Sequence, residues 1–194
     1  MKIGLISDIH CNLPGLERAL DLLRDCDEVL CAGDILYQYR FSNEVLGLLA
    51  ARGVRAIVGN HDKTVLYTPG LPLRQSASVD PGHLAYLAAL PDQLSLTLGG
   101  LRVAMFHGAP WDEPRATSAC YLYPEDERQF GRLAEVDADV IVLGHTHRAF
   151  TARLGEILVV NPGSCGEPRD GTRNLTCAVL DTASRGVEFH RFPM

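Results

Sequence analysis

The sequence lacks long apolar runs, closely paired cysteines and any excess of basic residues. No apolar run approaches the ~18 residues that a membrane-spanning helix needs. The six cysteines contain no Cys-x-x-Cys pair, and their irregular spacing argues against a small secreted disulfide scaffold. The formal charge of −6 disfavours a nucleic-acid scaffold, because phosphate backbones attract basic surfaces. We therefore expect no membrane insertion and no stable nucleic-acid complex.

The composition is that of an ordinary globular domain. Hydrophobic residues make up 46% of the chain and charged residues 22%. A length of 194 residues allows one substantial core and is short for two, so we expect a single domain over residues 1–194. The first apolar run is broken at Ser7 and Asp8 and is too short for a signal peptide. The cytoplasm is the expected location.

The first sixty residues alternate between strand-like and helix-like patterns. Lys2 to Ile6 is expected to be a strand, and Pro14 opens a helix whose leucines recur at helical spacing. Glu28 to Cys31 is the second strand, Ser42 caps the second helix, and Val54 to Val58 is the third strand. Such strand-helix-strand units imply parallel strands with right-handed crossovers. The carboxyl ends of these strands share the edge where open α/β sheets bind ligands.

The second half of the chain predicts further strands at closer spacing. After a weakly patterned stretch, Asp80-Pro81 opens a helix through about Leu90, and one more helix is expected at roughly Pro124 to Ala134. The apolar-rich runs suggest a second sheet, largely antiparallel or mixed. These runs are Leu101 to Phe106, Val140 to Leu143, Ile157 to Val160, Leu175 to Leu180 and Val187 to Phe192. We expect an α/β fold with two sheets packed face to face and helices outside.

Five segments share one pattern, in which an apolar strand ends and polar residues of metal-ligand type follow at once. Each segment alone could be a capped turn or could contain a hydrogen-bonded core histidine. Five such coincidences at matching positions are harder to accept than one shared site. The segments are Asp8-Ile9-His10, Gly33-Asp34, Gly59-Asn60-His61-Asp62, Phe106-His107-Gly108 and Gly144-His145-Thr146-His147.

The donor types in these segments point to metal chemistry. Two aspartates, one asparagine and four imidazoles are more ligands than one tetrahedral zinc ion takes. They suit two divalent metals that share a bridge, and Asp34 is a natural bridging carboxylate. Mixed nitrogen and oxygen donors favour manganese, iron, nickel or zinc over magnesium or calcium. Two metals ~3.5–4 Å apart stabilise an in-line displacement and activate a bridging hydroxide, chemistry that serves phosphate esters best.

The order of these motifs resembles the calcineurin-like metallophosphoesterase superfamily, and more closely its small single-domain bacterial and archaeal phosphodiesterases. The resemblance covers nearly the whole chain. It includes Asn161-Pro162-Gly163-Ser164 and Pro168-Arg169-Asp170-Gly171, which are similar to the C-terminal loop of that subgroup. The implied fold is a four-layer α/β/β/α sandwich of two mixed sheets flanked by helices, in agreement with the architecture expected above.

The resemblance also implies a role for each residue. One metal would be bound by Asp8, His10, Asp34 and His147, and the other by Asp34, Asn60, His107 and His145. His61 would be left as the general acid that protonates the leaving alkoxide, with Asp62 holding or tuning its imidazole. The implied cofactors are two divalent ions, with manganese as the first expectation and iron, nickel or zinc as alternatives.

Departures from the family pattern narrow the expected substrate. Gly33-Asp34 is followed by Ile35-Leu36-Tyr37, where protein serine/threonine phosphatases and symmetrical diadenosine tetraphosphatases carry an acidic-Arg-Gly run. The arginine that would clamp a monoester is missing, which disfavours those two subfamilies. Because the ligand set is complete and the acid His61 is present, we expect a phosphodiesterase acting on small or nucleotide-like diesters. The alternatives are a non-catalytic scaffold subunit on the same fold and a phosphomonoesterase for nucleotides or sugar phosphates. A homo-oligomer is compatible with the sequence. Cys11 lies at a position where related chains commonly have glycine, and it is a candidate for influencing metal choice. The loop from Ala109 to Glu125 is a candidate for substrate contact.

Overall fold

The computed structural model describes residues 1–194 and contains two five-stranded sheets. The first sheet has the strand order β10-β9-β1-β2-β3 and the second the order β4-β5-β6-β8-β7. The strands of the first sheet are β1 (Lys2–Ile6), β2 (Glu28–Cys31), β3 (Arg55–Ala56), β9 (Asn174–Asp181) and β10 (Gly186–Pro193). Those of the second are β4 (Gln93–Leu98), β5 (Leu101–Phe106), β6 (Val140–Val142), β7 (Ala149–Leu154) and β8 (Ile157–Pro162).

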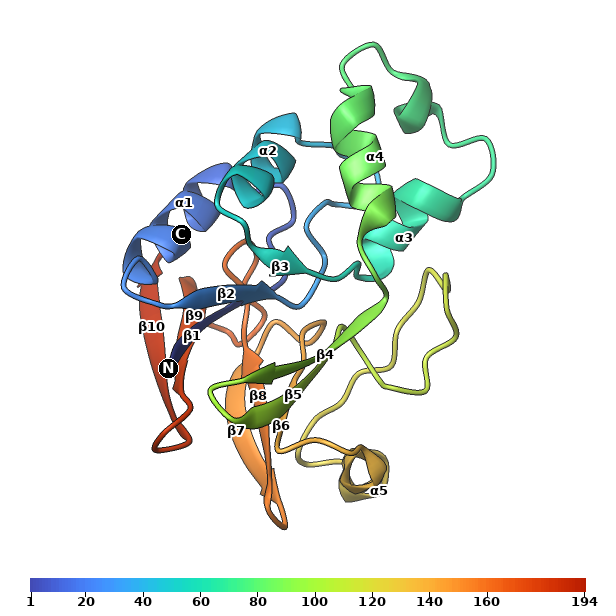
Figure 1. The fold of residues 1–194 in the computed structure, drawn as a ribbon. Coiled ribbons are helices and arrows are strands. Elements are labelled where there is room, and N and C mark those ends of the chain that lie inside the picture. Colours follow the sequence, from blue (N-terminus) through green and yellow to red (C-terminus); the bar gives the residue numbers. More distant parts are fainter.

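Helices cover the outer faces of both sheets (Figure 1). The helices are α1 (Leu13–Leu22), α2 (Asn43–Ala51), α3 (Asn60–Tyr67), α4 (Pro81–Ala89) and α5 (Glu127–Gly131), with short 3-10 helices η1 (Pro72–Gln75) and η2 (Arg132–Glu135). Figure 1 shows α1 and α2 against the first sheet and α5 against the second. This arrangement confirms the expected sandwich of two mixed sheets flanked by helices. None of the helices combines the length and the apolar character that crossing a membrane would require.

Three apolar clusters fill the spaces between these layers. One lies between the first sheet and α1, α2 and α4, and another lies on the outer face of the second sheet. The middle cluster joins the two sheets, with Ile3 and Leu30 from the first and Val103 and Val142 from the second. Burying these side chains from water holds the strand ends of both sheets in fixed relative positions. The loops at the carboxyl ends of the parallel strands therefore meet at one edge.

The first half of the chain follows the sequence-based predictions closely. The bounds of β1 and β2 are those expected, and β1, β2 and β3 pair in parallel. Ser42 caps α2 by accepting the N–H of Val45, and Asp80 caps α4 ahead of Pro81. The strand expected over Val54 to Val58 is shorter, because only the two residues of β3 pair with β2.

The second half needed three corrections. The runs that form β9 and β10 join the first sheet, where β9 pairs antiparallel with β1, and not the second sheet as expected. Both β4 and β7 were missed; they are exposed along one face, which weakens their apolar signal. The helix expected from Pro124 begins instead at Glu127, after the Asp126 cap, and tightens into η2. An apolar run shows that a strand is buried but not which strand it pairs with.

Candidate metal centre

Loops at the carboxyl ends of five strands meet where the two sheets join, and they carry every predicted ligand. The loops after β1, β2 and β3 come from the first sheet, and those after β5 and β6 from the second. The Asp8 N–H donates to the Gly33 carbonyl at 3.0 Å, and the Gly144 N–H donates to the His107 carbonyl at 2.9 Å. The main chain thus ties together loops that are far apart in sequence.

The side chains gather in two groups that share one carboxylate. The first group is Asp8, His10, Asp34 and His147, and the second group is Asp34, His107 and His145. All are buried, and the donor atoms of each group lie within 4.8 Å of one another. Asn60, the remaining predicted ligand, places Oδ1 3.1 Å from Nε2 of His107. The fold therefore brings together all seven residues that the sequence proposed.

Five of these residues have a left-handed backbone conformation, which residues with side chains rarely adopt. The φ angle is 54° at Asp8, 48° at His10, 52° at Asp34, 66° at His145 and 55° at His147. Each such conformation costs ~1–3 kcal/mol and persists only where the surrounding structure holds it, commonly at functional sites. The concentration of this strain at the predicted ligands is independent support for a functional centre.

Three of the four imidazoles donate one ring N–H to a backbone carbonyl. The pairs are His107 Nδ1 with the Ala32 carbonyl at 2.7 Å, His145 Nε2 with the Ala119 carbonyl at 3.0 Å, and His147 Nδ1 with the Glu167 carbonyl. Because a carbonyl only accepts, the second nitrogen of each neutral ring keeps a lone pair. Metal-binding histidines are commonly fixed by such a contact, which sets the tautomer and the ring orientation.

Oδ2 of Asp34 is buried without a hydrogen-bond donor and faces two imidazole nitrogens. It lies 3.2 Å from Nε2 of His107 and 3.8 Å from Nε2 of His10, while Oδ1 accepts the N–H of His61 at 2.8 Å. A buried carboxylate and an imidazole lone pair need a proton or a cation between them. Burial lowers the pKa of His107, but the charge of Asp34 raises it to about 9. The donors therefore fit a divalent metal site, in which a metal ion would supply the positive charge of that proton.

The other imidazoles are kept neutral, as metal binding requires. Burial lowers the pKa of His10 to about 4, of His145 to about 4 and of His147 to about 3. Asp34 behaves differently. Burial would raise its pKa, but the charge of His107 holds the pKa below its ordinary value. Asp34 is therefore the permanent negative charge at the point where the two groups meet.

Asp62 makes no hydrogen bond to the imidazole of His61, which corrects the expectation that it holds the ring. Its carboxylate accepts three backbone N–H groups, from Gly59 at 2.9 Å, Ile35 at 3.1 Å and Leu36 at 2.8 Å. Burial raises the pKa of Asp62 to about 7, and these three donors oppose the shift. Asp62 is the third residue of α3, so it joins the start of that helix to the loop after β2. It orders two ligand-bearing loops and does not orient the ring.

The ring of His61 packs against Tyr37 and His10, at 4.9 Å between centroids in each case. Nδ1 of His61 accepts the backbone N–H of Gln38 at 3.2 Å, a partner that the sequence gave no means of finding. A nitrogen that accepts carries no proton, so Nε2 holds the proton of the neutral ring. Burial also lowers the pKa of His61. In this conformation His61 is a neutral hydrogen-bond donor.

Cys11 lies beside the centre but belongs to neither donor group. Its φ of 61° explains why glycine suits this position. The thiol donates to the Arg40 carbonyl at 3.3 Å, and burial raises the pKa of Cys11. The guanidinium of Arg40 donates to the carbonyl of His10 at 2.6 Å and so helps to fix the first group.

The loop at 109–125 is closed at its base by Asp112. One carboxylate oxygen of Asp112 accepts the N–H of Ala109 at 2.7 Å and that of Cys120 at 3.1 Å. A Cβ at Gly108 would lie 2.5 Å from this oxygen, so the closed form requires glycine there. The sequence marked this loop as a candidate but gave no sign that Asp112 closes it.

The closed loop holds His145 from two sides. The Ala119 carbonyl accepts from its ring, and the ring of Tyr121 stacks on it at 4.0 Å between centroids. The ring of Tyr123 lies parallel to Tyr121 at 6.0 Å, whereas Trp111 packs against the apolar cluster outside the second sheet. A surface loop thus supports a ligand of the second group.

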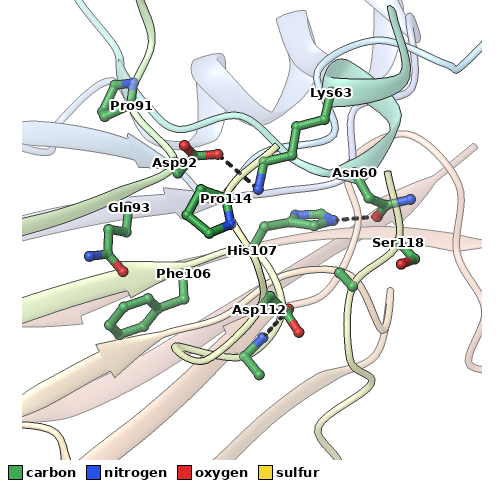
Figure 2. A pocket seen from close by; sticks show the side chains of 13 residues that line it. Asn60, Lys63, Pro91, Asp92, Gln93, Phe106, His107, Asp112, Pro114 and Ser118 are labelled. Carbon is green, nitrogen blue, oxygen red and sulfur yellow. Dashed lines mark hydrogen bonds and ion pairs between the residues drawn. The ribbon is translucent and has the colours of Figure 1, made fainter. Parts of the chain in front are cut away.

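A cavity of about 320 Å³ opens beside the second group (Figure 2). Asn60 and His107 form its wall toward the metal donors, and Asp112 and Ser118 belong to the loop side. Lys63 also lines it and places Nζ 2.8 Å from Oδ1 of Asp92. Lys63 is not among the residues predicted from the sequence, although a residue three positions after Asn60 lies on the same face of a helix.

Comparison with known proteins gives a consistent result. The sequence profile of the Calcineurin-like phosphoesterase superfamily domain matches residues 1–185. A phosphodiesterase of Methanocaldococcus jannaschii is 24% identical over 192 residues, which is 95% of each chain. An uncharacterized protein of the same organism is 28% identical over 219 residues, 97% of this chain and 86% of its own. The crystal structure of a metallophosphoesterase from Sphaerobacter thermophilus is 26% identical, with a TM-score of 0.77 over 99% of this chain and 88% of its own.

These matches run through both sheets and all five ligand-bearing loops. They agree with the divalent metal site derived from the donors and their carbonyl partners. The chain belongs to the calcineurin-like phosphoesterase superfamily and is a metal-dependent hydrolase of phosphoric esters.

Proposed function

We propose that the chain is a phosphodiesterase that hydrolyses small or nucleotide-like diesters at two divalent ions, with manganese as the first expectation. The observation that carries the proposal is Oδ2 of Asp34, which is buried without a donor and common to both groups. The first ion would be held by the first group, and the second by the second group together with Asn60. When bound, the ions supply positive charge to the phosphoryl oxygens and lower the pKa of a bound water.

The surrounding side chains favour a diester over a monoester. A monoester brings an extra negative charge, which needs a free cation close to the centre. Residues 35–37, after Asp34, offer none. Three cations that border the site are paired with a carboxylate: Lys63 with Asp92, Arg148 with Glu125 and Arg169 with Glu167.

His61 is proposed to assist the departing oxygen by donating from Nε2. The Gln38 N–H at Nδ1 keeps this ring in the tautomer that donates there. Full transfer of a proton would leave the ring anionic unless Nδ1 first gained a proton, which requires the Gln38 contact to break. Hydrogen bonding to the developing negative charge is therefore the role that this geometry supports. Removing one such donor typically lowers kcat by ~10²–10³-fold.

The test uses two diesters that differ in leaving group and a matched monoester. With manganese, bis(p-nitrophenyl) phosphate should be hydrolysed faster than p-nitrophenyl phosphate. His61→Ala should lower the kcat for the diester by ~10²–10³-fold, and His61→Gln, which keeps an N–H donor, should recover part of the loss. A second diester with an alkyl leaving group separates the roles. If His61→Gln recovers activity on bis(p-nitrophenyl) phosphate but not on the alkyl diester, His61 transfers a proton. Faster turnover of the monoester than of the diester would overturn the diester proposal.

A further inference from the structure

We propose that the cavity beside the second group is a subsite for the ester arm that stays on the phosphorus, and that it takes a neutral, hydroxyl-bearing arm such as a sugar or glycerol. The inference rests on the proposed diester hydrolysis and adds a substrate class to it. Its support is the position, size, polarity and charge of the cavity.

The position of the cavity selects the retained arm. Asn60 and His107 line it, so it opens directly onto the second group. His61 does not line it and packs instead beside Tyr37 and His10. If the leaving oxygen departs next to His61, the cavity is left for the other arm of the diester.

The size and polarity of the cavity suit a hydroxylated group. Its volume of about 320 Å³ is roughly ten times the ~30 Å³ that one water molecule occupies in the liquid. Seven of its thirteen lining residues carry polar side chains, whereas sites for apolar ligands are lined mainly by apolar and aromatic side chains. Gln93 adds an amide and Ser118 a hydroxyl, both able to donate and accept. A sugar ring finds partners here that an aryl or lipid arm would leave unused.

The charges in the cavity exclude a second phosphate. The side chain of Lys63 is 11% exposed, and its ammonium is neutralised by Asp92. Asp112 adds a further carboxylate (Figure 2). Another anionic group would therefore meet no free positive charge. A hydroxyl, in contrast, can accept from one of the remaining Lys63 N–H donors and donate to Asp92.

The experiment compares diesters that share one leaving group. Thymidine 5′-(p-nitrophenyl) phosphate, glyceryl p-nitrophenyl phosphate and bis(p-nitrophenyl) phosphate differ only in the retained arm. We expect a higher kcat/KM for the two hydroxylated arms than for the aryl arm. A comparable kcat/KM for the thymidine and glyceryl diesters would show that the hydroxyl groups are recognised. A much higher kcat/KM for the thymidine diester would show that the base is also bound. A preference for the aryl arm would overturn the inference.

Substitutions then locate the preference in the cavity. Lys63→Met keeps an unbranched chain as long as the apolar stem of lysine and removes the donors, so it should lower the ratio of hydroxylated to aryl kcat/KM by ~10-fold, the effect of one lost charged hydrogen bond. Gln93→Leu should lower the same ratio by less. Lys2→Met makes the identical change on an exposed residue of β1 and should leave the ratio unchanged. An unchanged ratio in Lys63→Met would contradict the assignment. A loss of folded protein would lower the activity on every diester by the same factor and would leave the ratio unchanged.

A binding measurement separates this inference from the proposed function. Thymidine 5′-monophosphate, glycerol 3-phosphate and phenyl phosphate carry the same arms and can be titrated calorimetrically into manganese-loaded protein. Tighter binding of the hydroxylated compounds, lost in Lys63→Met, would support the subsite even if no diester were hydrolysed. Equal binding of all three would refute it even if diesters were hydrolysed.

Discussion

The two ligand groups are built in different ways, although they share Asp34. The first group stands on loops that follow core strands, and its members are at most 2% exposed. The second group depends on the surface loop at 109–125, whose Ala119 carbonyl and Tyr121 ring hold His145. Supporting contacts outside the ligands commonly change metal affinity by ~10–100-fold. The second metal position therefore depends on the loop at 109–125, whereas the first depends on a different contact, the Glu167 carbonyl at the ring of His147.

The largest expected effect comes from the residue that the two groups share. Asp34→Asn keeps the shape of the side chain and removes its charge, so both metal positions should weaken together. Losing several kcal/mol of transition-state stabilisation corresponds to a fall in kcat/KM of ~10³-fold or more. Metal analysis after dialysis should show fewer than two manganese ions per chain. A variant that retained two ions and full activity would show that Asp34 is not the bridge.

A smaller effect, on the affinity of only one metal site, is expected when Asp112 no longer closes the loop at 109–125. Asp112→Ala removes the acceptor for Ala109 and Cys120, so His145 loses its fixed carbonyl partner. Calorimetric titration with manganese should show one site weakened by ~10–100-fold and the other unchanged. Asp126→Ala is the matched control, since this carboxylate caps α5 and touches neither group. Equal weakening of both sites in Asp112→Ala would remove the contrast between the groups.

The smallest expected effect is on thermal stability. One site filled at 100 times its Kd adds ~2.7 kcal/mol to the folded state, and each kcal/mol shifts Tm by ~2–4 °C in a domain of this size. Chelation should therefore lower Tm by ~5–10 °C per filled site when followed by differential scanning calorimetry. His147→Ala should abolish the part due to the first group, and His145→Ala the part due to the second. No change of Tm on chelation would mean that the donors do not hold a metal in the folded protein.

The sequence by itself determined the donors and the strand ends that carry them. Each ligand directly follows an apolar run, and neighbouring parallel strands place such positions at one edge. The bounds of β1 and β2 and the caps at Ser42 and Asp80 were readable because they depend on contacts within a few residues.

Only the tertiary structure decided how those donors are held. The Gln38 N–H on His61, the three backbone donors on Asp62 and the carbonyl behind His145 come from segments distant in sequence or from the main chain, which leaves no mark on residue type. The same reason explains why β9 and β10 were expected in the wrong sheet. Residue types determine which chemistry is available, whereas long-range backbone contacts determine the orientation of each group.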